Sequence, residues 1–181
     1  MLMTKLEYAI YFATKAHAGQ KRKSEDVDMI YHPFIVGMLL KNYGLRDEVV
    51  IAGILHDVVE DTKYTERDIE DIFGLEVKNL VLYASEPDKS LSWEERKKHT
   101  IECSRTIPYE AKLIICADKI SNLDTLYKDL MEQGEKVWLN LNRGKELQQW
   151  YYEELLKSIR ENEEDNELFR RYEEILEKIF S

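Results

Sequence analysis

The chain has 181 residues, of which 44% are hydrophobic and 34% charged, and its formal net charge is -10. This length supports one domain with its own core, and the composition is that of a soluble globular protein. The acidic balance opposes binding to nucleic-acid backbones and to anionic lipid, so neither a nucleic acid nor a membrane is expected as a partner. A small polyphosphate stays compatible, because a metal ion and a few local cations can reverse the field inside one pocket.

The sequence also bears on where the protein works. No window approaches the roughly 20 apolar residues that a membrane helix requires. The N-terminus leads into a charged amphipathic segment without the apolar core of a signal peptide. The two cysteines, Cys103 and Cys116, lie in different segments and form no CxxC pair, which fits a reduced compartment. We therefore expect a cytoplasmic protein.

All the elements that the sequence predicts are helices. Only 7 glycines and 3 prolines occur, and hydrophobic residues recur at helical spacing along most of the chain. The predicted helices cover about residues 4–18, 32–42, 46–61, 65–73, 76–84, a segment that begins at 92, 108–130, 145–161 and 164–180. The sequence thus predicts an all-α protein, a compact multi-helix bundle in a single domain.

The first candidate for chemistry is the His56-Asp57 pair, which follows the apolar run 49–55. Burying an unpaired charge there would cost several kcal/mol, so a compensating partner is expected. On one continuous helix, His56 shares a face with Glu60, and Asp57 shares a face with Asp61. The alternative is a helix end with acidic surface residues, which is disfavoured because acids oppose the helix dipole at its C-terminus.

Two further polar residues stand out, His32 and Asp118. His32 lies at the start of a predicted helix, where a lone histidine is more often a cap or a packed polar residue than a ligand. Asp118 follows an apolar run, and a carboxylate in such a place needs a metal, a cation or several hydrogen bonds. Asn122 lies one turn further on the same face, whereas Lys119 offers the alternative of neutralising a neighbouring acid.

Taken together, these residues supply two imidazoles and two carboxylates from three predicted helices. Such a mixed set of nitrogen and oxygen donors suits Mn²⁺, Fe²⁺ or Zn²⁺ and is poor for Ca²⁺. The order His…His-Asp…Asp along the chain resembles that of the HD phosphohydrolase superfamily.

More closely, the sequence resembles the hydrolase domain of the RelA/SpoT enzymes and the small stand-alone alarmone hydrolases related to it. The matching segments are residues 16–23, 32–33, 52–62, 69–74 and 117–123. The stretch His56-Asp57-Val58-Val59-Glu60-Asp61-Thr62 is the most specific, because plain HD proteins lack its Glu-Asp continuation. The resemblance implies a single HD domain over residues 1–181, with its core at about 5–160 and a C-terminal helix at about 164–180.

The resemblance also implies roles for the polar residues of the site. One Mn²⁺ would be bound by His32, His56, Asp57 and Asp118. Glu60 and Asp61 match the acidic pair that the family uses to activate and orient water. The metal is expected to be manganese, with Fe²⁺ or Zn²⁺ as options.

Substrate contacts follow from the same resemblance. Arg22 and Lys23 match basic residues that contact the substrate, and Asn122 matches a pocket residue near the ribose. One departure is Met29, three residues before His32, where many relatives have Tyr. The contacts to the base or ribose are therefore the part of the resemblance that this chain does not fully share.

The function implied is metal-dependent removal of the 3′-pyrophosphate from guanosine tetra- or pentaphosphate. A small nucleotide is thus the expected partner, and the oligomeric state is left open, with a homodimer as one option. One alternative is a phosphatase that acts on another nucleotide, such as a dinucleotide 2′-phosphate. A second alternative is an alarmone-binding protein without catalysis.

Overall fold

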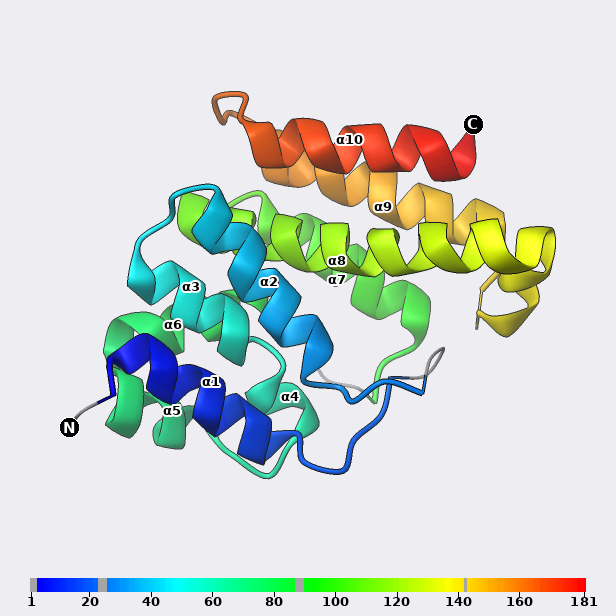
Figure 1. Ribbon diagram of the computed structural model, residues 1–181. Coiled ribbons are helices and arrows are strands. Elements are labelled where there is room, and N and C mark those ends of the chain that lie inside the picture. The colour runs from blue at the N-terminus through cyan, green and yellow to red at the C-terminus, as the bar shows by residue number, and fades with distance from the viewer. Residues whose placement is uncertain (1–2, 23–25, 87–89, 142) are drawn as a thin grey trace. The chain divides into compact units, whose positions relative to one another are not determined.

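The structure is a computed structural model that describes residues 3–22, 26–86, 90–141 and 143–181 (Figure 1). Throughout these ranges the regular elements are helices, and the extended structure is one isolated antiparallel bridge between Lys21 and Asp28. The all-α prediction is therefore confirmed. None of the helices in the described part combines the length and the apolar composition needed to cross a membrane.

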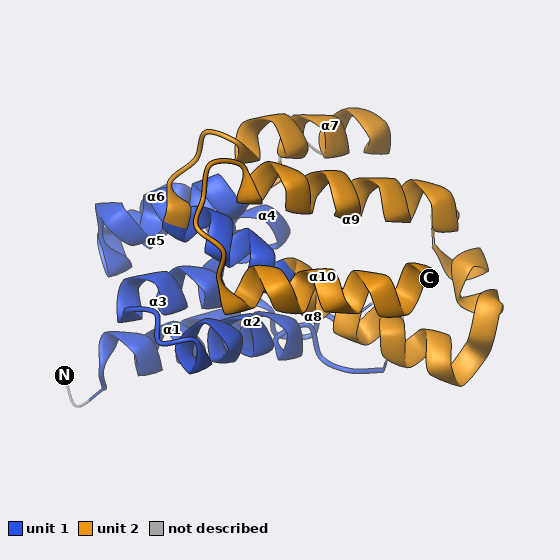
Figure 2. Ribbon diagram, turned by 90° about the horizontal axis from the view of Figure 1, so that it is seen from above, with its two compact units in different colours: residues 1–85, 110–118 blue, residues 86–109, 119–181 orange. Residues whose placement is uncertain are grey.

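The chain divides into two compact units, residues 1–85 with 110–118 and residues 86–109 with 119–181 (Figure 2). The organisation of residues 1–181 as a single domain stays a prediction.

The first unit is built from short helices and the first part of a long one. Its elements are α1 (Lys5–Ala16), α2 (Tyr31–Asn42), α3 (Asp47–Leu55), α4 (Val58–Asp61), α5 (Glu66–Phe73), α6 (Leu75–Ala84) and the start of α8 (Tyr109–Gln133). Thr65 caps α5, and the Asp68 side chain accepts a bond from the Thr65 N–H in return.

The prediction of a single helix over residues 46–61 is wrong at one point. The structure ends α3 at Leu55 and begins α4 at Val58, so His56 and Asp57 form a break between two helices. The His56 ring contributes to this break, because its Nδ1 lies 2.7 Å from the Gly53 carbonyl oxygen, the group that a continuous helix would offer to the Asp57 N–H. The face-sharing expected of His56 with Glu60 therefore no longer follows from helical periodicity.

Close packing of α2 on α3 brings the ends of these helices together. Residues 49–55 of α3 are all buried. A Cβ atom on Gly37 would overlap the Ile54 side chain, and a Cβ atom on Gly53 would overlap Leu40. The two glycines thus let the backbones approach at a distance that larger residues would prevent, and the start of α2 meets the end of α3.

Arg46 ties the start of α3 to two other helices of this unit. Its guanidinium donates two bonds of 2.6 Å to the Glu110 carboxylate on α8 and one of 2.6 Å to Glu76 on α6. These hydrogen bonds raise the pKa of Arg46 above its ordinary value. The first turn of α8 is thereby held against α3, on the helix that carries Asp118.

The second unit contains α7 (Trp93–Ser104), the rest of α8, a 3-10 helix η1 (Gly134–Asn140), α9 (Lys145–Arg160) and α10 (Glu167–Phe180). Its core includes buried apolar and aromatic side chains of the last two helices, among them Tyr151, Leu155, Ile159, Phe169 and Tyr172.

A charged cluster lies within this second unit around Glu86. Its carboxylate pairs with Lys97 and lies 2.9 Å from the Arg96 guanidinium, and its side chain is only 15% exposed. The Lys97 and Lys119 ammonium groups lie 4.6 and 5.8 Å from the centre of the Tyr151 ring. Burial raises the pKa of Glu86, but Lys119, Lys97 and Arg96 together hold it below its ordinary value.

The packing of α2 on α3 predicts the effect of Gly37→Ala. The added methyl group meets the middle of the Ile54 side chain rather than its mobile end, so the free energy of unfolding should fall by about 1–2 kcal/mol. Urea denaturation measures this change. Gly144→Ala is the matched control, because nothing lies within 4 Å of the added atom there. Equal stability of the two variants would contradict the close-approach argument.

The Glu86 cluster predicts a stability difference that depends on pH. Glu86→Gln should lower the free energy of unfolding by about 2 kcal/mol at pH 7, because Arg96 and Lys97 lose a charged acceptor. Since the pKa of Glu86 is lowered in the folded state, this contribution is complete above its ordinary pKa of 4.5 and is lost as the pH falls through the lower folded value. Denaturation of both proteins between pH 7 and pH 3 measures the difference.

Exposed Glu102 provides the control for that series, as Glu102→Gln should have little effect at any pH. A deficit of Glu86→Gln that does not shrink in acid would contradict the charge argument.

Candidate metal centre

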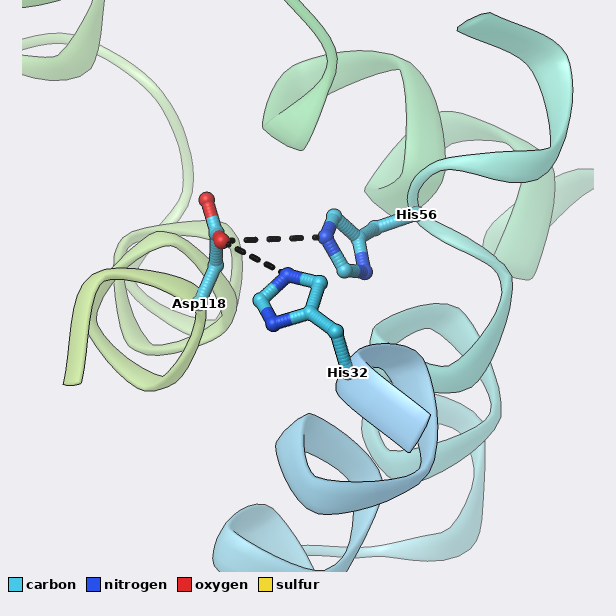
Figure 3. A group of neighbouring side chains, drawn as sticks. All are labelled: His32, His56 and Asp118. Carbon is cyan, nitrogen blue, oxygen red and sulfur yellow. Dashed lines mark ion pairs between the residues drawn. The ribbon is translucent and has the colours of Figure 1, made fainter. Parts of the chain in front are cut away.

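Three buried side chains from three helical segments of the first unit converge on one point. His32 lies in the first turn of α2, His56 directly follows α3, and Asp118 projects from α8 (Figure 3). One possible ligand atom from each residue lies within 4.8 Å of those of the other two. Such a group can hold a metal ion.

Asp57 belongs to the same cluster. Its Oδ1 lies 3.1 Å from the His56 Nε2, and its Oδ2 lies 3.8 Å from the His32 Nε2. The Asp118 Oδ1 lies 3.1 Å from the His32 Nε2 and 3.8 Å from the His56 Nε2. Each imidazole Nε2 therefore faces two carboxylates, and the structure brings together all four residues that the sequence singles out as ligands.

A hydrogen bond of the His56 ring determines which ring nitrogen carries the proton and which one faces the cluster as an acceptor. A carbonyl oxygen can only accept, so the contact of 2.7 Å with Gly53 places the proton on Nδ1. In a neutral ring, the Nε2 electron pair then points toward the carboxylates. Metal-binding histidines are commonly oriented in this way, by a bond from the other ring nitrogen to a backbone carbonyl.

The charge of the cluster is consistent with a bound cation. The Asp57 and Asp118 side chains are 16% and 10% exposed, and two carboxylates so close together and so poorly hydrated repel one another. Two imidazole nitrogens with carboxylate oxygens form a donor set that fits a divalent transition metal. The residues present therefore suit a metal of the type expected from the sequence.

The other predicted site residues are placed as follows. Glu60 and Asp61 lie on α4, directly after the break, with Glu60 half-buried and Asp61 exposed. Arg22 is half-buried, and its N–H donates to the Val27 carbonyl across the loop between α1 and α2. Lys23 lies outside the described residues. Asn122 belongs to the second unit, so its place near the substrate stays a prediction.

Two polar residues next to this site carry contacts that the sequence does not predict. His17 is 2% exposed, and its Nδ1 lies 2.8 Å from the Gln20 Oε1. The Gln20 Nε2 in turn donates to the Asp61 carbonyl oxygen at 2.8 Å. Both residues fall in a segment that resembles the RelA/SpoT hydrolases, but no periodicity or charge pattern links residue 20 with residue 61.

The family comparison agrees with this geometry. Residues 9–146 match the family model described as HD domain. The guanosine-3′,5′-bis(diphosphate) 3′-pyrophosphohydrolase MESH1 of Xenopus tropicalis is 37% identical over 155 residues, which cover 84% of this chain and 83% of that protein.

Two solved structures are also similar. A Listeria monocytogenes protein, 42% identical, superposes with a TM-score of 0.78 and covers 82% of this chain and 98% of that chain. A metazoan ortholog of SpoT that hydrolyzes ppGpp, 27% identical, superposes with a TM-score of 0.80 and covers 98% of this chain and 97% of that chain.

The cluster predicts that a divalent metal stabilises the folded protein. A metal present at about 100 times its Kd should add about 2.7 kcal/mol to the free energy of unfolding, or roughly 5–10 °C in Tm for a chain of this size. Asp118→Asn and His32→Gln should each abolish most of this shift, because each removes a possible ligand from the cluster. Thermal denaturation with and without Mn²⁺ measures it.

Exposed Asp71 on α5 is the control, and Asp71→Asn should keep the full shift. A metal-induced shift that survives both ligand substitutions would place the metal elsewhere.

Proposed function

The chain belongs to the HD-domain family, and on that premise we propose that it removes the 3′-pyrophosphate from guanosine tetra- or pentaphosphate. The observation that carries the proposal is the convergence of His32, His56 and Asp118 beside a helix that bears Glu60 and Asp61. The name of the Xenopus relative and the activity of the metazoan SpoT ortholog support the same substrate.

We propose His32, His56, Asp57 and Asp118 as the ligands of one divalent metal, with Mn²⁺ as the preferred ion and Fe²⁺ or Zn²⁺ as alternatives. When bound, such an ion lowers the pKa of water toward neutrality and offsets the negative charge of a phosphate. The remaining tasks of the reaction fall to the protein's own side chains.

Glu60 and Asp61 are proposed to take the proton from the attacking water and to orient that water. Their helix begins directly after Asp57, and the Asp61 N–H donates to the Asp57 carbonyl oxygen at 2.9 Å. One helical turn therefore connects a proposed metal ligand with the proposed bases. General-base assistance of this kind contributes about 10²–10⁴-fold in rate.

The substrate's own charge requires cations outside the metal cluster. We propose that Arg22 and Lys23 balance the pyrophosphate and that Asn122 contacts the ribose, as the resemblance implies. Lys21 has a different role, because its ammonium pairs with Asp26 at 3.2 Å and Asp28 at 2.9 Å within the same loop. A cytoplasmic location is part of the same proposal, since a nucleotide substrate and cysteines without a CxxC pair both fit that compartment.

One observation favours a second candidate function. Met29 stands where the resemblance to the RelA/SpoT hydrolases leads us to expect Tyr, and a thioether cannot donate the hydrogen bond of a phenol. A phosphatase that acts on another nucleotide would use the same cluster with different contacts to the base. A binding protein without turnover has less support, because it would have no need for both Glu60 and Asp61.

The proposal predicts the products of a direct assay. Protein supplied with Mn²⁺ should convert guanosine tetraphosphate into GDP and pyrophosphate, and Glu60→Gln and Asp61→Asn should each lower kcat by about 10²-fold while nucleotide binding persists. Product analysis measures the turnover, and calorimetry measures the binding. Glu66→Gln on α5, an exposed acid outside the cluster, is the control and should keep full activity.

The other outcomes separate the alternatives. Release of orthophosphate from a different nucleotide would favour the second candidate function. Binding of the alarmone without any product from the wild-type protein would favour a non-catalytic role.

A further inference from the structure

We propose that Gln20 is a positioning residue that holds the Asp61 end of α4 in place, with its side chain oriented by His17. The inference rests on the proposed role of Asp61 as a base, and it assigns a task to two residues outside the metal cluster. Neither residue is placed against the substrate or the metal, so each acts through Asp61.

The backbone of Gln20 is fixed on both sides. Its N–H donates to the His17 carbonyl at 3.0 Å, and its carbonyl accepts from the Met29 N–H at 2.9 Å. The second bond closes the loop in which Arg22 lies, next to the bridge between Lys21 and Asp28. Gln20 therefore starts from a defined position at the base of this loop.

The side chain of Gln20 is fixed as well, by two hydrogen bonds: one requires an acceptor on the amide and the other requires a donor. Its Oε1 can only accept, so the His17 Nδ1 donates to it across 2.8 Å. Its Nε2 can only donate, and it donates to the Asp61 carbonyl oxygen at 2.8 Å. The two contacts together fix which end of the amide faces α4.

Burial of His17 strengthens this arrangement. The ring is 2% exposed, and its Nε2 has no hydrogen-bond partner within the part of the chain that the structure describes. A proton on that nitrogen would be buried without an acceptor, which is costly. The ring is therefore best satisfied with its proton on Nδ1, the state that donates to Gln20.

The bond to Asp61 matters because α4 is a single turn of four residues. An isolated turn is unfavourable, and the last carbonyl groups of a helix find no partner within it. Gln20 supplies a donor to Asp61 from 41 residues away along the chain. One residue thus anchors both the end of α4 and the loop of Arg22, so it fixes the proposed base relative to a proposed substrate contact.

The test starts with Gln20→Met, which keeps the length of the side chain and removes both hydrogen bonds. With guanosine tetraphosphate and Mn²⁺, kcat should fall about 10-fold and KM should change less than about 3-fold, because a misplaced base affects the reaction more than binding. The Mn²⁺-induced rise in Tm should persist. Gln149→Met is the matched control, since the Gln149 amide bonds to Glu153 on its own helix in the second unit.

Hydrogen exchange of backbone amides tests the bond between Gln20 and Asp61 without requiring turnover. Amides of residues 58–64 should exchange faster in Gln20→Met than in the wild type, and at the wild-type rate in Gln149→Met. Unchanged exchange in Gln20→Met would overturn the inference. Faster exchange together with a wild-type protein that does not hydrolyse the alarmone would instead overturn the proposed function and leave the mechanical link in place.

A double-mutant cycle separates positioning from a general loss of structure. If Gln20 acts through Asp61 and the turn that carries it, adding Gln20→Met to a variant with both Glu60→Gln and Asp61→Asn should lower kcat by less than about 2-fold further. A full 10-fold loss in that background would show that Gln20 acts independently of α4 and would overturn the inference.

Discussion

The imidazoles of His32 and His56 and the carboxylates of Asp57 and Asp118 meet where little water reaches them. Two adjacent carboxylates in such a place are unfavourable without a positive charge, and imidazole nitrogens that face them offer electron pairs to the same ion. A divalent metal satisfies both requirements at once. Other features of the first unit help to bring these four side chains together, and α4 carries the two acids that are proposed to act on water beside the metal.

Three features of the first unit help to position this cluster. Gly37 and Gly53 allow α2 and α3 to approach closely, which places His32 near His56. Arg46 fixes the start of α8 through Glu110, on the helix that carries Asp118. The break after Leu55 places the proposed ligands His56 and Asp57 before α4, so that Glu60 and Asp61 lie on a separate helical turn.

Much of this could be predicted from the sequence, for identifiable reasons. Helical periodicity and caps such as Thr65 are local signals, and they located most of the helices. The His56-Asp57 pair stood out because polar groups at the end of an apolar run need partners. The order of the four polar residues along the chain then pointed to the cluster that the structure brings together.

The rest depended on contacts that no local pattern records. The helix break coincides with a contact between the His56 ring and the Gly53 carbonyl, which no local sequence pattern indicates. The link between Gln20 and Asp61 depends on two segments that meet through the fold. Asn122 lies on a helix, as predicted from the sequence. Because it belongs to the second unit, its contact with the ribose remains a proposal.

We propose that His32, His56, Asp57 and Asp118 together hold one divalent metal. Crystals grown with Mn²⁺ and measured for anomalous scattering test it most directly. One strong peak is expected within about 2–2.3 Å of the Nε2 atoms of His32 and His56 and of an Asp118 oxygen. A peak at another place, or no peak in crystals in which these side chains are well ordered, would contradict it.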